Sequence, residues 1–457
     1  MNGKDRGLST SYSSPGQNDG GSGRHAGRQA DLHISQDAKL DGRMMNSMPT
    51  LEHREKQPHA KLSEKSGGTS GEAYTQTHTR TMGAANKGED EEFEYYWQEY
   101  PADGSFLARL DWAFDICSTF RMTGWNWAIR CLPPYEVPPR TADGHQLPLS
   151  SLPNRSEEGY TRSPSRRHFF LKRLFVNVIP SYILVDLCAV LMMQDPYFIV
   201  GPTDDLPLPP HLAAMHPALL SLRRTSLSLL GVLSALHLVF NSGALCLCLL
   251  FPPVLGFRAH PWHLPTVSGS FAQVLDRGLA GFWGAWWHQT FRFGFEAPAR
   301  WLRLGPRGAI AVAFLQSGLL HAAGSYSTVP DSRWWEPPLF FLLAGLGVQL
   351  QRWLVSRVLP LLLGLAPRGL VARGAPPRWA CRLGNLAFVL AWLQATSWPL
   401  LDDFGRCGLW LFEPVPVSLF RALGYGPPGD RRVWRYDSGF LARWYSGKHW
   451  WDSGIGL

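Results

Sequence analysis

Long apolar runs alternate with polar and arginine-rich stretches over the second half of the chain. The clearest runs cover residues 174–193, 225–257, 308–326 and 385–401. Three of them are close to the ~20 residues with which a helix crosses the hydrocarbon core, and 225–257 is longer and predicts one long tilted helix that ends near Pro252 and Pro253. A further run covers 337–350 and resumes at 353–365, as either one bent span or two short ones. The pattern predicts an all-α integral membrane protein, a bundle of about five to eight transmembrane or re-entrant helices.

Residues 1–92 have the opposite composition, with many Gly, Ser, Lys, Glu, Asp, His and Thr residues and few aromatic ones. Such a segment has too little apolar surface to offset the entropy of ordering, so we expect a disordered polar tail. Because the first residues contain no apolar stretch, a cleaved signal peptide is not expected. Residues 93–172 are interpreted as a cytosolic or interfacial pre-membrane region, and residues 173–457 as the membrane domain.

The net charge of +8 comes largely from arginines beside the apolar runs, and no nucleic-acid-binding motif accompanies it. We therefore expect membrane lipids, and no nucleic acid, as partners. The basic stretch 162–173 before the first run predicts a cytosolic start, and the arginine-rich loop 258–307 returns to the cytosol two spans later. The seven cysteines are scattered and lack metal-ligand spacing, which argues against a disulfide framework and a metal site.

Three ionisable side chains fall inside apolar runs, where a polar group without a partner is costly. Asp186 is interpreted as a structural hydrogen-bonding group or as part of a polar path, and His237 as a structural residue. His321 lies in the polar-spotted stretch QSGLLHAAG. It is either a structural histidine, bonded to a neighbouring carbonyl or to Ser317 one turn earlier, or a functional group.

The stretch GFWGAWWHQT, residues 281–290, sets three tryptophans around a histidine. Trp283, Trp286 and Trp287 share one face at i, i+3, i+4 spacing, while nearby arginines interrupt the apolar pattern. This pattern predicts an amphipathic helix at the bilayer surface. His288 is then either a wet residue beside an interfacial aromatic belt or a functional group in an aromatic frame.

The two histidine-bearing motifs also carry a resemblance to a known family. FWGAWWHQTFR followed by FLQSGLLHAAG resembles the wax synthase-like branch of the membrane-bound O-acyltransferases, and its fungal secondary-metabolite members most. The blocks STFRMTGWNWAIRCLPP and GKHWWDSGIGL are similar to further motifs of that branch. The resemblance extends over about residues 95–457.

The resemblance implies roles for both histidines. His321 matches the intramembrane histidine that acts as general base, and His288 matches a polar position that orients the thioester or stabilises the developing oxyanion. A neutral imidazole suits proton removal from a hydroxyl near neutral pH. We expect the acyl-CoA site to include the following further residues: Trp283, Trp286, Trp287, Arg292 and Ser317. Arg277 or Arg300 would assist Arg292 with the CoA phosphates, although setting the topology is an alternative role for each arginine.

The function implied is an O-acyltransferase of the endoplasmic reticulum membrane. It would move an acyl group, acetyl first of all, from acyl-CoA as co-substrate to a lipophilic alcohol such as a terpenoid, without a bound cofactor. One alternative is a long-chain wax ester synthase. Another is a non-catalytic membrane scaffold or carrier that uses Asp186, His237 and His321 as a polar path, although no internal repeat supports a carrier.

Overall fold

The computed structural model of the protein describes most of the chain from residue 100 onward and two short strands before it. The described residues are 75–80, 93–98, 100–125, 127–133, 154–163, 165–203, 205–328, 332–361, 376–436, 443–450 and 453–456. The chain divides into two units, Met1–Ser66 and Gly67–Leu457, and every described element lies in the second. Apart from strand β1, the predicted tail 1–92 lies outside the described residues, as do Asn126, Trp451 and Asp452 of the motifs.

Helices make up nearly all the described secondary structure. The longer α-helices are α2 (Phe106–Ser118), α4 (Ile179–Met192), α7 (Pro217–Leu250), α9 (Ala272–Gly281), α10 (Arg292–Trp301), α11 (Pro306–Thr328), α12 (Glu336–Trp353), α14 (Arg378–Thr396) and α15 (Trp398–Arg406). Short α-helices are α3 (Arg166–Leu171), α5 (Pro196–Val200), α6 (Pro210–Ala213), α8 (Pro252–Leu255) and α16 (Leu419–Ala422). The π-helical stretches are η3 (Lys172–Val178), η6 (Phe282–Trp286) and η7 (Leu354–Val358), and the 3-10 turns are η4 (Gly256–Ala259), η5 (Pro261–His263) and η8 (Leu409–Leu411). Two antiparallel pairs join β1 (Thr75–Arg80) to β2 (Phe93–Gln98) and β3 (Arg443–Tyr445) to β4 (Gly454–Gly456).

Four helices among the described residues are long and apolar enough to cross a membrane. They are Arg166–Met192, Pro217–Leu250, Pro306–Thr328 and Glu336–Leu361. Each covers most of one of the predicted apolar runs, so the interpretation as a helical membrane protein is confirmed. The first span begins well before residue 173, which places the predicted boundary between the last two regions inside a helix.

Two of these spans continue through a proline by way of a π-helical stretch. Proline lacks a backbone N–H, and its ring clashes with the carbonyl four residues earlier. In the first span, η3 ends two residues before Pro180, and Asn177 Nδ2 donates to the Lys172 carbonyl at 3.2 Å. In the last span, η7 ends two residues before Pro360. Residues 337–361 therefore form one continuous helix, which settles the alternative of two short spans.

The fifth predicted span, 385–401, is wrong as a single helix. The chain there forms α14 and α15, with Ser397 between them, and neither is one of the four candidate spans of the described residues. Pro399 lies in the first turn of α15, where the missing backbone N–H of a proline costs least, so it fits a new helix that starts there. The division matters for the site, because it turns α15 back toward α12.

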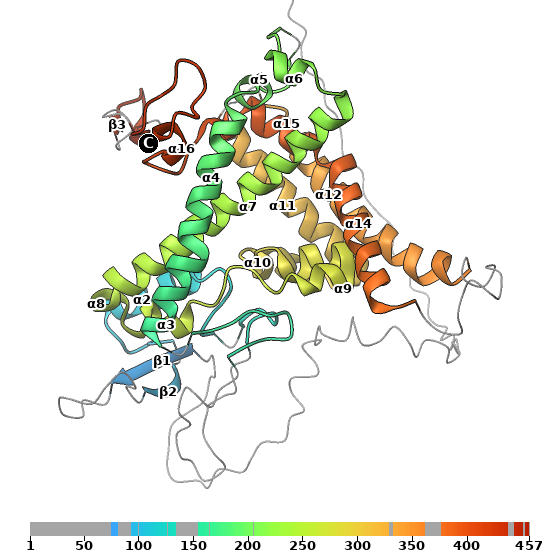
Figure 1. Ribbon diagram of the computed structural model, residues 1–457. Coiled ribbons are helices and arrows are strands. Elements are labelled where there is room, and N and C mark those ends of the chain that lie inside the picture. The colour runs from blue at the N-terminus through green and yellow to red at the C-terminus, as the bar shows by residue number, and fades with distance from the viewer. Residues whose placement is uncertain are drawn as a thin grey trace, which may run out of the picture. The chain divides into compact units, whose positions relative to one another are not determined.

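Two hydrophobic clusters hold the spans together. One joins α4, α5, α12 and α15 through residues that include Phe198, Phe341 and Phe404, and the other joins α9, η6, α12 and α14. The side chains of Trp283 and Phe314 pack against both clusters. Figure 1 shows the long helices α4 and α7 in contact with each other, and α11 in contact with α12.

Candidate active site

The tryptophan segment does not form the continuous surface helix that its periodicity predicts. Helix α9 passes into η6, and the chain then leaves the helical conformation at Trp287, whose ψ is 149°. The side chain of Gln289 satisfies two carbonyls freed by this break, because its Nε2 donates to Trp283 O at 2.8 Å and to Trp287 O at 2.7 Å. The prediction of one amphipathic helix is therefore wrong, because Gly278 (φ +59°) kinks α9, the chain leaves the helix after Trp286, and α10 begins only at Arg292.

The three tryptophans do gather on one side, as their spacing predicts. Their rings surround Phe282, with centroid separations of 4.8 Å for Trp283, 5.1 Å for Trp286 and 5.6 Å for Trp287. They pack against the buried cluster of α9, α12 and α14 and do not form a separate surface belt. The segment is thus packed against the protein interior, and His288 follows it directly in the chain.

His288 lies in the break between η6 and α10, within an aromatic frame. Its ring is 5.3 Å from that of Trp287 and 5.9 Å from that of Phe240 on α7. Its Nδ1 atom is buried and has no hydrogen-bond partner among the described residues. Burial, together with repulsion from His321, Arg121 and His237, lowers the pKa of His288 to about 4. The imidazole is therefore neutral at pH 7, and its Nδ1 is left without a partner among the described residues.

His321 lies on α11, and its hydrogen bond defines which ring nitrogen can act as a base. Nδ1 is 2.7 Å from the carbonyl oxygen of Ser317, one turn earlier. A carbonyl oxygen only accepts hydrogen bonds, so Nδ1 of the neutral ring carries the proton and Nε2 carries the lone pair. The contact with Ser317 that the sequence suggests is present, through the backbone of Ser317 and not its hydroxyl. It orients the ring and leaves Nε2 free to take a proton.

Aromatic side chains connect the two histidine-bearing segments. The ring of Phe341 on α12 is 4.7 Å from that of His321 and 6.0 Å from that of Trp283. Phe404 on α15 contacts the other side of the site, 6.3 Å from the His321 ring. The structure thus brings together the tryptophan segment and His321, which are separated by a complete helix in sequence. Sequence reasoning missed Phe341 and Phe404, because nothing in an apolar run marks which ring will face a histidine.

His237 on α7 is a third histidine of the site. Its Nε2 is 3.1 Å from Ser268 Oγ, and a positive charge on it would repel one on His288. Asn241, one turn later, donates to the His237 carbonyl at 2.6 Å, and Arg173 donates to Asn241. His237 is therefore part of a bonded network, as its interpretation as a structural residue requires. Among the described residues, no three His, Cys, Asp or Glu side chains form a group that could hold a metal ion.

Two arginines fix the loop that leads into the tryptophan segment. Arg121, from the block that precedes the membrane spans, donates to the carbonyls of Thr266 at 2.9 Å and Pro265 at 3.2 Å. The buried Arg173 donates to the carbonyls of Leu264 at 2.7 Å and Pro265 at 2.9 Å. Charge-assisted bonds of this kind are stronger than neutral ones. These bonds fix the backbone at residues 264–266, directly before Ser268, whose hydroxyl contacts His237.

The arginines expected to bind CoA phosphates have partners within the protein. Arg292 Nε is 2.6 Å from Glu296 Oε1, and Arg292 Nη1 donates to Gly284 O at 2.9 Å. Arg277 Nη1 donates to Gln273 Oε1 at 3.2 Å, and the Arg300 guanidinium lies over the ring of Phe293 at 5.6 Å. Arg292 thus ties α10 to the turn before it. The Glu296 partner at i+4 is a signal visible in the sequence.

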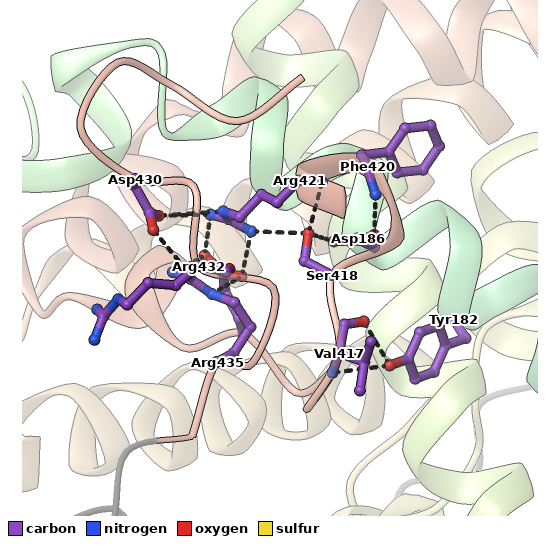
Figure 2. Close-up of polar contacts among 10 residues, drawn as sticks. Tyr182, Asp186, Val417, Ser418, Phe420, Arg421, Asp430, Arg432 and Arg435 are labelled. Atoms are coloured by element: carbon purple, nitrogen blue, oxygen red, sulfur yellow. Dashed lines mark hydrogen bonds and ion pairs between the residues drawn. The ribbon is translucent and has the colours of Figure 1, made fainter. Parts of the chain in front are cut away.

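Asp186 is a structural group. Its carboxylate oxygens accept hydrogen bonds from Ser418 Oγ at 2.6 Å and from the backbone N–H of Phe420 at 3.0 Å. Figure 2 shows both donors pointing at Asp186 from the turn that begins α16. Close by, Arg421 and Arg435 share the carboxylates of Glu413 and Asp430. The network fastens the C-terminal segment to α4, and among the described residues its bonds run from Asp186 to the segment around α16.

The comparison with family models agrees with this geometry. Residues 264–343 match the model of the Membrane bound O-acyl transferase family. The matched stretch contains His288, His321, the three tryptophans and Phe341, and it excludes His237 and Asp186. Neither the comparison with curated proteins nor that with solved structures finds a match. The similarity is therefore to a family of membrane O-acyltransferases, and it covers the part of the chain that contains both His288 and His321.

Proposed function

We propose that the protein is a membrane-bound O-acyltransferase of the wax synthase-like branch. It transfers an acyl group, most readily acetyl, from acyl-CoA to a hydroxyl of a lipophilic acceptor such as a terpenoid. The observation that carries this proposal is the tautomer of His321, whose Nδ1 is bonded to the Ser317 carbonyl so that Nε2 presents a lone pair. The match of residues 264–343 supplies the reaction class.

His321 and His288 divide the work of the reaction. His321 Nε2 accepts the proton of the acceptor hydroxyl as its oxygen attacks the thioester carbon, which forms a C–O bond. The C–S bond then breaks, and the imidazolium of His321 returns the proton to the departing thiolate of CoA. His288, neutral and with an unpartnered buried nitrogen, donates its N–H to the thioester oxygen as negative charge develops there.

The aromatic surroundings support this division. Trp286 and Trp287 form the wall of the acyl entrance beside His288, and their rings are 6.3 Å apart. Trp283 and Phe341 close the space between the entrance and His321, so water that would hydrolyse the thioester is kept out. We assign Arg292 to shaping this entrance and not to holding a phosphate, because its guanidinium already bonds Glu296 and Gly284.

The topology supports delivery of acyl-CoA from the cytosol. Positive charge before the first span places that end in the cytosol, and two spans later the segment with His288 returns there. We place the protein in the endoplasmic reticulum membrane, where a cytosolic acyl-CoA and a membrane-dissolved alcohol meet.

Membranes that contain the protein provide the test. We expect labelled acetyl-CoA with farnesol or menthol to give the acetyl ester, and labelled palmitoyl-CoA with hexadecan-1-ol to give much less ester. Faster transfer of palmitate would assign a long-chain wax ester synthase instead. Absence of ester from every donor and acceptor, in membranes that contain correctly inserted protein, would contradict acyl transfer.

A further inference from the structure

A buried carboxyl group without a partner lies next to the proposed site. Asp403, on α15, is completely buried, and neither of its oxygens is in good hydrogen-bonding geometry with a described residue, although the Ser325 hydroxyl is a polar neighbour of its carboxyl group. Its sequence neighbour Asp402 differs, because it accepts a hydrogen bond from Tyr197 Oη at 2.7 Å. Two other fully buried acids, Asp195 and Glu336, are each paired with arginines. Asp403 thus differs from Asp195 and Glu336, because no arginine pairs with its buried carboxyl group.

An unpaired acid at such a position needs an explanation. Burial of a carboxyl group without hydrogen bonds is costly, and an apolar side chain of similar volume would avoid that cost. Desolvation raises the pKa of Asp403, while the neighbouring Ser325 hydroxyl opposes that rise. A neutral carboxyl group both donates and accepts hydrogen bonds, as a hydroxyl does. A ligand hydroxyl is therefore a natural partner for it.

The position of Asp403 relates it to the reacting atoms. Ser325, the polar side chain that faces it, is buried on α11 one turn after His321, and residues four apart are neighbours on a helix surface. The next residue on α15, Phe404, has its ring 6.3 Å from that of His321. Asp403 is not needed to orient His321, because the Ser317 carbonyl already bonds Nδ1. It lies beyond His321 along α11, toward the end of that helix opposite to α10.

We propose that Asp403, together with Ser325, recognises a second hydroxyl of the acceptor. This inference rests on the proposed function and narrows its substrate class to lipophilic diols and polyols. One hydroxyl lies at His321 Nε2 and is acylated, while another hydrogen-bonds the Asp403 carboxyl group. An alcohol with a single hydroxyl leaves the buried carboxyl unpaired, and that lowers its kcat/KM by about 10- to 100-fold.

A pair of acceptors with one carbon skeleton tests this proposal. Menthol has one hydroxyl, and p-menthane-3,8-diol has a second. In membranes with labelled acetyl-CoA, the wild-type protein should prefer the diol by about 10- to 100-fold in kcat/KM. Asp403→Leu should reduce that preference to about one, because an apolar side chain offers no polar group to the second hydroxyl and leaves no carboxyl group unpaired with menthol. Asp403→Asn should retain most of the preference, because an amide still bonds a hydroxyl.

The control variant is Asp402→Asn, which changes the adjacent acid and should leave the ratio of the two rates unchanged. An equal rate of the wild-type protein on both acceptors would overturn the proposal, and so would a preference that survives in Asp403→Leu. Loss of transfer to both acceptors in a normally inserted Asp403→Asn variant would also overturn it, because the carboxyl group would then serve the chemistry or the fold. Failure of the proposed function looks different: the wild-type protein then acylates neither compound.

Discussion

Substitutions of His288 can distinguish a chemical role of this residue from a packing role. Its ring contacts Trp287 and Phe240, so a purely structural histidine at this position would act through the shape of its ring. Its buried Nδ1, in contrast, has no partner among the described residues. His288→Leu keeps an apolar side chain in the frame and removes the donor. His288→Asn removes the ring and keeps a donor.

The size of the effect follows from the role as donor to the oxyanion. Loss of one such donor typically costs about 10²–10³-fold in kcat, which corresponds to about 3–4 kcal/mol in the transition state. We therefore expect His288→Leu to lose about that factor and His288→Asn to lose about tenfold or less. Because burial holds the pKa of His288 near 4, the wild-type ring is neutral and its contribution should not change between pH 6 and pH 8.

Initial rates of acetyl transfer to menthol, in membranes normalised for protein level, distinguish the two roles. The donor role requires His288→Asn to be faster than His288→Leu. If His288→Leu matches the wild-type protein, or exceeds His288→Asn, then His288 acts by packing and the assignment is refuted. Phe240→Leu, which changes the frame without removing a donor, serves as the control and should stay within a few-fold of the wild type.

Three further predictions concern the framework of the site. Asp186→Ala should lower the free energy of unfolding by about 2–4 kcal/mol, because two buried donors lose their acceptor, and the thermal midpoint in detergent measures this. Gly278→Ala should cost about 1–3 kcal/mol in the same assay, since Gly278 has φ +59° and a Cβ there would overlap Gln351; an unchanged midpoint would be inconsistent with this kink. In a cysteine-free background, Arg167→Cys and Arg307→Cys should both be labelled from the cytosolic side, and labelling of either from the lumen would reverse the proposed entry of acyl-CoA.

The spans and the identity of the main histidines could be predicted from sequence, because both depend on local patterns. Apolar length alone locates the four candidate spans, and a histidine in an apolar run is visible without a structure. The i,i+4 spacing also suggests the contact between His321 and Ser317. The tautomer of His321 depends on whether its ring contacts the hydroxyl or the carbonyl of Ser317. Only the side-chain geometry in the structure shows that the carbonyl is the partner.

Features that depend on tertiary contacts could not be predicted. The break after Trp286 is stabilised by Gln289, whose amide reaches two backbone carbonyls, and helical periodicity does not contain that information. The ion pair of Arg292 with Glu296 could have been predicted from sequence, because Glu296 follows at i+4. The hydrogen bond from Arg292 to the Gly284 carbonyl could not. Asp403 had one signal, a pair of adjacent acids at the end of an apolar run. Which of the two acids is paired depends on the fold around Tyr197.

The most direct test of the account is the turnover of His321→Ala. General-base catalysis typically contributes about 10²–10⁴-fold, so acetyl transfer by this variant should fall by that factor while insertion and protein level remain normal. His211→Ala, at an exposed histidine of α6, is the matched control and should transfer acetyl at the wild-type rate. A His321→Ala protein that inserts normally and keeps near wild-type turnover would contradict the central claim that Nε2 of His321 takes the proton of the acceptor.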